Sequence, residues 1–302
     1  MMSMKKIILG LGLLIALTGA ALILFVTGTK YIGVHVALIL IGAALARQSR
    51  YFDDNFYHNA SPQAFYPTAG LLIPWFAWLA AVLVIYGLYV SFAIAPTDFQ
   101  QGEAYRIIFV HVPAAWMSMV IYVAMAFWAG LGLILNARLS AMMAQALAPT
   151  GAIFTLLALV TGSLWGKPMW GTYWVWDARL TSELILLFLF LGFIALQSSI
   201  DDPRKADRAG ALLALVGVVN VPIIYFSVKW WSTLHQGSSI NMGAAPKMAA
   251  TMFEGMIIMA LAFWMYTIAV TLIRARCIIL ERERNSGWVK ELATRESSGA
   301  KS

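Results

Sequence analysis

The 302-residue chain contains a single cysteine, Cys277, and its charged residues make up only 12% of the total. One cysteine excludes an intrachain disulfide and a Cys-x-x-Cys redox pair. The chain also lacks a Walker A motif, because Gly166-Lys167 is followed by Pro168 and no glycine stands at the required upstream spacing. A dithiol redox enzyme and a nucleotide hydrolase of the P-loop type are therefore excluded.

Apolar residues make up 61% of the chain, and they are arranged in long runs. That composition predicts an all-α polytopic membrane protein rather than one or two soluble domains. The runs predict a six-helix transmembrane core with spans at about 71–93, 107–135, 141–163, 180–197, 209–228 and 251–273. In such a chain the net charge of +7 reports orientation in the membrane lipid and does not indicate nucleic-acid binding.

Two further apolar runs, at about 7–26 and 31–46, precede the core. The first is long enough to span a membrane and the second is marginal, so the sequence predicts an N-terminal hydrophobic extension over 1–65, with a hairpin as one interpretation. The domain that carries the six spans is predicted over 66–302. His35 and His58 in the extension are isolated and are interpreted as ordinary satisfied or solvated histidines.

Basic residues are biased toward one set of loops. The predicted inner loops and tail contain Arg138, Arg204, Lys205, Arg208, Arg274, Arg276, Arg282 and Arg284. The predicted outer loops contain Arg106, Lys167, Arg179, Lys229 and Lys247. The bias places both ends of the core in the cytoplasm, on the inner side of the membrane. The outer cations need a separate reason, and an anionic ligand on that face is one.

The tryptophan-rich segment, Trp165 to Thr181, lies between two apolar runs on the predicted outer face. Its aromatic residues are Trp165, Trp170, Tyr173, Trp174 and Trp176. One interpretation is a plain interfacial anchor, since indole has an apolar body and a polar N–H. The other is a platform for a flat, apolar, partly charged ligand. Gly166, Pro168 and Gly171 argue against a continuous helix here and predict an outer loop over about 164–179.

Two histidines, His111 and His235, stand at the predicted outer ends of different spans, on the same face as this segment. Histidine is a usual axial ligand of haem iron, and a porphyrin stacks well on indole. Arg106 and Arg179 lie at the same predicted depth, where they can pair with anionic propionates. Haem held by two histidines is therefore one hypothesis, and interfacial hydrogen bonding by each histidine is the other. Asp177 either orients Arg179 or an indole N–H, or caps the following helix.

Three motifs in this order and spacing resemble one protein family. They are 105–115 (Tyr-Arg-Ile-Ile-Phe-Val-His-Val-Pro-Ala-Ala), 170–183 (Trp-Gly-Thr-Tyr-Trp-Val-Trp-Asp-Ala-Arg-Leu-Thr-Ser-Glu) and 230–237 (Trp-Trp-Ser-Thr-Leu-His-Gln-Gly). Together they resemble CcmC, the haem exporter protein C family of bacterial cytochrome c maturation, over about residues 71–293. The resemblance implies a six-span inner-membrane protein that holds haem b on its periplasmic face and presents it to the haem chaperone CcmE. It also implies CcmD and the ABC transporter subunits CcmA and CcmB as partners, and a haem-handling assembly factor rather than an enzyme.

The resemblance carries the iron-ligand role onto His111 and His235, and the platform role onto Trp170, Trp174 and Trp176 of the WWD motif. The family's usual Trp-Gly-Thr-Trp-Trp is here Trp-Gly-Thr-Tyr-Trp, so Tyr173 stands where a tryptophan is usual. A tyrosine keeps the aromatic face, and we expect a modest effect. No counterpart of the N-terminal extension is recognised in the family.

Three alternatives are compatible with the same residues. A b-type cytochrome passing electrons usually buries its bis-histidine haem between helices within the membrane. A haem lyase resembling the related CcmF and CcsA proteins would be an enzyme, and those proteins usually carry additional haem-ligating histidines. A binding module that only scaffolds the transporter would hold no haem.

Overall fold

The structure is a computed structural model that describes three stretches of the chain: 61–231, 234–235 and 248–299. The chain divides into two compact units, Met1–Phe65 and Tyr66–Ser302. Residues 1–60 lie outside the described part, so the N-terminal hairpin and the interpretation of His35 and His58 stay predictions.

Every regular element in the described part of the chain is helical, apart from an isolated bridge between Asp98 and Gly102. In chain order the elements are α4 (Pro62–Tyr89), the π-helix η3 (Val90–Ile94), the 3₁₀-helix η4 (Glu103–Ile107), α5 (Ile108–Leu135), α6 (Arg138–Trp170), α7 (Ala178–Ser199), α8 (Pro203–Gly217), α9 (Asn220–Trp230), α10 (Ala250–Arg282) and α11 (Gly287–Gly299). Among the described residues, six helical stretches are long and apolar enough to cross a membrane. The predicted all-α polytopic fold with six spans is confirmed.

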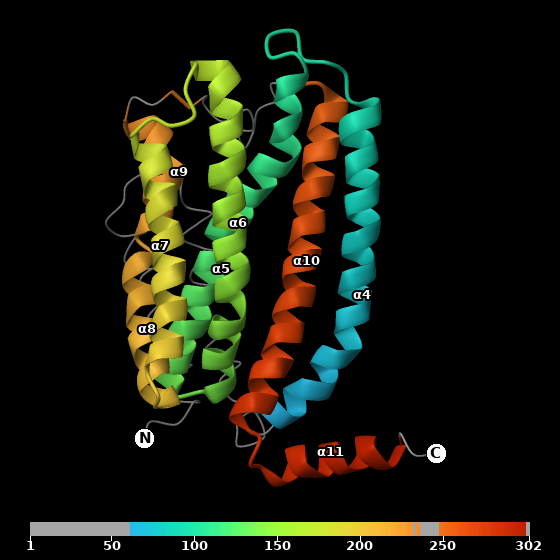
Figure 1. Cartoon of the computed structure of the whole chain (residues 1–302), viewed down its shortest axis with the longest axis vertical. Coiled ribbons are helices and arrows are strands. Elements are labelled where there is room, and N and C mark those ends of the chain that lie inside the picture. The colour runs from blue at the N-terminus through green and yellow to red at the C-terminus, as the bar shows by residue number, and fades with distance from the viewer. Residues whose placement is uncertain (1–60, 232–233, 236–247, 300–302) are drawn as a thin grey trace, which may run out of the picture. The chain divides into compact units, whose positions relative to one another are not determined.

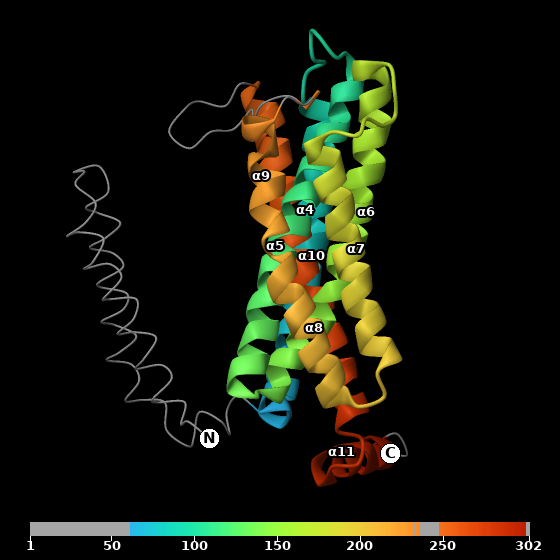
Figure 2. The same ribbon diagram turned by 90° about the vertical axis from the view of Figure 1, so that its left-hand side faces the viewer.

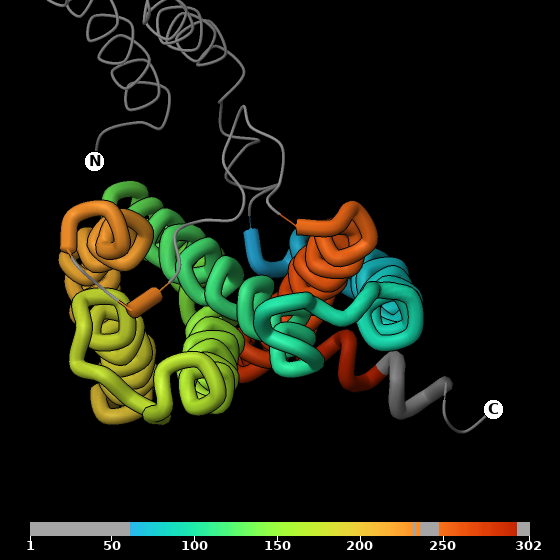
Figure 3. The backbone as a smooth tube through the Cα atoms, turned by 90° about the horizontal axis from the view of Figure 1, so that it is seen from above, coloured from blue at the N-terminus to red at the C-terminus, as the bar shows by residue number. Residues whose placement is uncertain are grey.

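The spans stand side by side, and each turn reverses the chain direction (Figures 1 and 2). Seen from above, α4 lies beside α10, while α7, α8 and α9 form the other side of the bundle, with α5 and α6 between the two groups (Figure 3). The tryptophan-rich segment and the end of α9 lie at one end of the bundle, which we call the tryptophan end. The turns α5–α6 and α7–α8 and the short helix α11 lie at the other, which we call the arginine end.

The bundle interior is closely packed because small residues face large ones across helix pairs. A Cβ built on Gly151 of α6 would lie 2.2 Å from a ring atom of Phe190 on α7, and one on Gly217 of α8 would lie 2.1 Å from the Tyr122 hydroxyl on α5. Phe190 and Tyr122 in turn meet edge to face at 4.9 Å. Small residues allow the helix backbones to approach closely, which is how helices associate when lipid replaces water.

The structure corrects the predicted end of the third span. Helix α6 continues without a break through Gly166 and Pro168 to Trp170, and the connecting loop is Gly171–Asp177 rather than 164–179. The glycine at 166 meets a packing need: an added Cβ would lie 3.0 Å from the Trp170 ring and 3.2 Å from the Thr172 carbonyl oxygen. The helix ends at Gly171, whose φ of 77° favours glycine.

The fifth predicted span is two helices, α8 and α9, which meet at Val218–Val219. Pro222 lies in the first turn of α9 and has no N–H to extend the hydrogen-bond ladder of α8. The Asn220 side chain instead donates to the Ser182 carbonyl on α7 at 2.8 Å. A polar contact thus joins the start of α9 to the neighbouring helix α7.

The first and last spans are longer than predicted, because their polar and aromatic extensions have partners in the fold. Helix α10 runs on to Arg282, whose guanidinium bonds Asp207 on α8 and Gln145 on α6. Helix α4 begins at Pro62, and the Tyr66 ring in its first turns lies 4.1 Å from the guanidinium carbon of Arg276.

We expect Gly151→Ala to destabilise the bundle, because the new methyl group has no room against Phe190. Overpacking of this kind costs about 1–3 kcal/mol of unfolding free energy. Thermal unfolding of the purified protein in detergent measures it. Gly287→Ala is the control, since an added Cβ there meets no atom within 4 Å. Equal unfolding midpoints for both variants would contradict this account of the α6–α7 contact.

Candidate functional site

The predicted site residues sit on several different segments at the tryptophan end. Trp165 and Trp170 lie in the last turns of α6, while Trp174 and Trp176 lie in the loop that follows it. Asp177 caps α7 and Arg179 stands in its first turn. His111 lies in the first turn of α5, and His235 follows α9 in the short described stretch 234–235.

His111 is oriented by the facing surface of α6. Its Nδ1 lies 3.0 Å from the Ala158 carbonyl oxygen and 3.1 Å from Thr161 Oγ1. A carbonyl oxygen only accepts, so Nδ1 carries the proton and donates. The Thr161 hydroxyl donates its own hydrogen bond to the Leu157 carbonyl at 2.6 Å, so its lone pairs can accept from His111. The arrangement leaves Nε2 of His111 unprotonated, with a lone pair for a metal.

The same surface of α6 fixes where the imidazole ring lies. A Cβ built on Gly162 would come within 2.9 Å of His111 Cε1, so only glycine permits this approach. The Trp165 ring meets His111 edge to face at 5.7 Å, and its indole N–H donates to Gln101 Oε1 at 2.9 Å.

Sequence reasoning identified His111 and Trp165 but missed their partners. Ala158, Thr161, Gly162 and Trp165 recur at three- and four-residue intervals, which is one face of a helix. That spacing was the available signal, but it does not say which neighbouring helix the face meets. To find these partners from the sequence, one would first have to know that α5 packs against α6.

His235 lies against the ring of Trp170, with centroids 5.1 Å apart. Burial lowers the pKa of His235 to about 4, and the positive charge of Arg179 adds to the effect. The imidazole is therefore neutral at physiological pH, which is the form that binds a metal. His111 also lies within electrostatic reach of both His235 and Arg179. The structure thus brings the two predicted histidines and this arginine into one neighbourhood.

The two predicted anion-binding arginines have different surroundings. Arg179 donates one hydrogen bond, at 2.8 Å, to the Ile224 carbonyl on α9. Its other N–H groups form no hydrogen bond within the described residues. Arg106 donates to Glu103 and to the carbonyls of Ser91 and Ala95. Its guanidinium fastens the end of η3 to η4, so protein acceptors already occupy the Arg106 side chain.

The loop presents an aromatic surface with unsatisfied polar atoms. Trp174 and Trp176 meet edge to face at 5.3 Å, and Trp176 is 75% exposed. The ring of Tyr173 lies 5.2 Å from the Lys167 ammonium. Within the described residues the buried Trp174 indole N–H has no hydrogen-bond partner. A buried donor of this kind is costly unless a ligand accepts from it.

Asp177 has one role that the structure settles. Its Oδ1 accepts from the Leu180 backbone N–H at 2.8 Å, so it caps α7 as one of the two interpretations predicted. Its other carboxylate oxygen is buried and has no hydrogen-bond partner among the described residues.

The arrangement offers two neutral imidazoles, an aromatic surface and a cation, all from different segments. No group of three or more histidine, cysteine or acidic side chains that could hold a metal ion occurs in the described stretches. A flat, apolar, anionic macrocycle that brings its own metal and four equatorial ligands fits this donor set.

The chain matches the family model described as heme exporter protein C over residues 55–290. It is 49% identical over 234 residues to heme exporter protein C of Escherichia coli strain K12, covering 77% of this chain and 94% of that protein. It is 46% identical over 228 residues to the Bradyrhizobium diazoefficiens protein of the same name, covering 75% and 86%. A cytochrome c biosynthesis ccmC-like mitochondrial protein of Marchantia polymorpha is 53% identical over 166 residues, covering 55% and 69%.

We expect His235 in the haem-free protein to titrate near pH 4, well below the ordinary histidine pKa of about 6.5. Because the folded state binds the proton less readily than the unfolded chain, stability from this group is present above about pH 6.5 and is lost as the pH falls toward 4. Histidine NMR signals measure the midpoint. Arg179→Ala removes a positive charge and should raise it. A midpoint near 6.5 in the unaltered protein would show that His235 is solvated.

Proposed function

Because the chain belongs to the haem exporter protein C family, we propose that it binds haem at the tryptophan end and presents it to the haem chaperone CcmE for cytochrome c maturation. The observation that carries this proposal is the contact of His111 Nδ1 with the Ala158 carbonyl oxygen and Thr161 Oγ1, which assigns the proton to Nδ1 and leaves Nε2 a lone pair. A histidine prepared in this way is suited to bind iron.

His111 and His235 are the proposed axial ligands of haem b. His111 is oriented by Ala158 and Thr161, and His235 is kept neutral by burial. Neutral imidazoles bind iron without first releasing a proton, so ligation has no proton cost near neutral pH. His111 belongs to the rigid α5–α6 pair, whereas His235 belongs to the connection between α9 and α10.

The loop supplies the proposed surface for the porphyrin. Trp170 packs on His235, and Trp174 and Trp176 extend the aromatic surface toward the outside, with Trp165 and Tyr173 at its edges. The Trp174 indole N–H and the remaining donors of Arg179 are the proposed partners of the propionates. The contacts of Arg106 support a structural role in place of the propionate role expected from the sequence.

The distribution of charge supports a periplasmic tryptophan end in a bacterial inner membrane. Arg138, Arg204, Arg208, Arg282 and Arg284 lie in turns and helix termini at the arginine end. Cytoplasmic loops carry the excess of basic residues. In this orientation CcmE meets the loop from the periplasm, while CcmD, CcmA and CcmB are the proposed partners in the membrane and on its cytoplasmic side.

The placement of the histidines favours presentation over electron transfer or haem attachment. His111 is in the first turn of its span and His235 lies outside the helices, so both are at the bundle end rather than in its interior. A b-type cytochrome encloses its haem between helices. The names of the relatives indicate a transport and maturation factor rather than a haem lyase.

We expect His111→Ala and His235→Ala each to alter the Soret and α/β absorption bands of the purified protein and to weaken haem retention. Each removes one axial ligand of the iron. His35→Ala and His58→Ala, in the N-terminal extension, are the controls and should leave the bands unchanged. Unchanged spectra in both ligand variants would overturn the ligation proposal.

A matched pair of variants separates ligation from general damage to α6. Gly162→Ala puts a methyl group 2.9 Å from His111 Cε1 and should change the haem spectrum although both histidines remain. Gly151→Ala, on the same helix, places its methyl group against Phe190 instead and leaves the surroundings of His111 unchanged. Equal spectral changes in the two would mean that the imidazole position is not what Gly162 controls.

We expect Trp176→Ala to insert normally and yet reduce covalent haem on the chaperone. Its side chain is 75% exposed, so folding does not depend on it, whereas losing one stacking indole costs about 1 kcal/mol of ligand contact. Trp75→Ala on α4, 72% exposed, is the matched control. The measurement is haem on CcmE at equal levels of inserted protein. Normal loading by the Trp176 variant would mean that the loop is only an anchor.

A further inference from the structure

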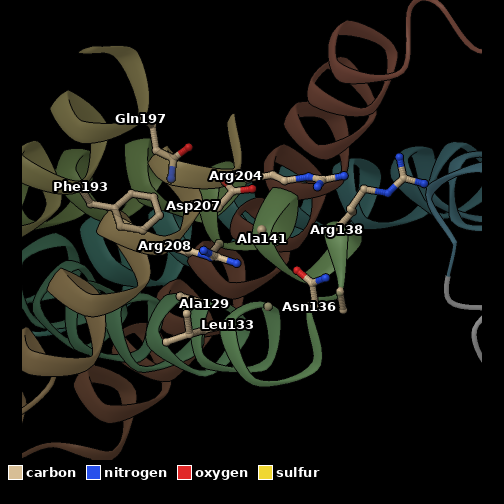
Figure 4. A pocket seen from close by; sticks show the side chains of 13 residues that line it. Ala129, Leu133, Asn136, Arg138, Ala141, Phe193, Gln197, Arg204, Asp207 and Arg208 are labelled. Atoms are coloured by element: carbon tan, nitrogen blue, oxygen red, sulfur yellow. The ribbon is translucent and has the colours of Figure 1, made fainter. Parts of the chain in front are cut away.

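A second hollow lies at the arginine end, between the α5–α6 turn and the first turns of α8 (Figure 4). Its volume is about 280 Å³. Its floor is apolar and includes the buried side chains of Ala129 and Phe193. Three guanidinium groups surround it, those of Arg138, Arg204 and Arg208. It is thus an apolar hollow with a basic rim, far from the tryptophan end.

The one acidic residue among those that line the hollow does not neutralise this rim. Both carboxylate oxygens of Asp207 accept hydrogen bonds from Arg282 on α10, at 2.8 and 2.9 Å. The fork of one guanidinium therefore takes up the whole carboxylate. The positive charge of Arg204 and Arg208 remains uncompensated by Asp207.

Two further carboxylates at this end, those of Glu283 and Asp202, have partners of their own. Glu283 lies 3.3 Å from Arg138 and balances that residue only. Asp202 caps α8, and its Oδ1 accepts from the backbone N–H groups of Arg204 and Lys205 at 2.9 and 3.4 Å. Within the part of the chain that the structure describes, neither Arg204 nor Arg208 forms an ion pair.

The geometry points to an anionic phospholipid as the occupant, with its phosphodiester headgroup between Arg204 and Arg208. Basic pockets between membrane helices on the cytoplasmic side bind such headgroups. The volume lies just below the range of about 300–1,000 Å³ that encloses a whole small ligand, so it suits a headgroup whose chains stay outside.

The apolar surface beside the hollow distinguishes a lipid from a free anion. Leu133 lines the hollow and is itself exposed on the outside of α5, next to Ile134, which is 67% exposed. Acyl chains leaving the hollow therefore continue along a lipid-facing surface. Asn136, also lining it, adds an amide donor for the headgroup. A free phosphate would use the arginines and leave this surface without a role.

The test compares lipid binding by the full-length purified protein in neutral detergent. Phosphatidylglycerol should raise the thermal unfolding midpoint and phosphatidylcholine should not. The double variant Arg204→Gln/Arg208→Gln should bind phosphatidylglycerol at least about tenfold more weakly. Arg204→Lys/Arg208→Lys keeps the charge but lacks the forked donors. Its affinity for phosphatidylglycerol should therefore lie between that of the unaltered protein and that of the glutamine variant.

The matched control is Arg284→Gln/Lys290→Gln, which removes two exposed charges at the same end outside the hollow. An equal loss of binding in the control would show diffuse attraction and overturn the proposed site. Inorganic phosphate alone should give no shift at the same concentration, and a shift equal to that of the lipid would reassign the hollow to a free anion. The haem spectrum should be unchanged in every variant, so this test is independent of the proposed haem site.

Discussion

The close contact between α5 and α6 is the constraint on which the candidate site depends. Gly162 allows the two helices to approach until the His111 ring lies over the α6 backbone. Only at that distance can Nδ1 reach both the Ala158 carbonyl and the Thr161 hydroxyl. Two ordinary hydrogen bonds then decide which imidazole nitrogen keeps its lone pair. The absence of a side chain at Gly162 thereby determines which nitrogen of His111 is available to a metal.

The second histidine is held by a different kind of contact. His235 lies beyond α9, against Trp170, and no regular element contains it. Arg179 connects the surroundings of the two histidines. Its guanidinium donates to the Ile224 carbonyl on α9, and its charge acts on both imidazoles. Under the proposed ligation, one axial ligand would come from the α5–α6 pair and the other from the segment that follows α9.

The two ends of the bundle have opposite chemistry for the same physical reason. Charged groups avoid the hydrocarbon layer, so the polar residues of a chain with six spans collect at its ends. At the tryptophan end they are mixed with exposed aromatic rings, and at the arginine end they form networks such as Arg282 with Asp207 and Gln145. That network ties α6, α8 and α10 together, and among the described residues it leaves Arg204 and Arg208 without a carboxylate partner. The basic hollow follows from it.

The sequence by itself determined the six spans, the end that carries the tryptophans, and the candidate residues His111, His235 and Arg179, because hydropathy and residue type are local properties. It misjudged the end of α6, since a buried glycine reads as a helix breaker until the side chain packed on it is known. The break between α8 and α9 was likewise hidden in one apolar run. Only the tertiary structure decided that Thr161 and Gly162 hold His111, that Arg106 is committed to a backbone junction, and that Arg204 and Arg208 share a hollow. Each of these depends on which helix faces which, and that is set by packing across the whole bundle rather than by any single segment.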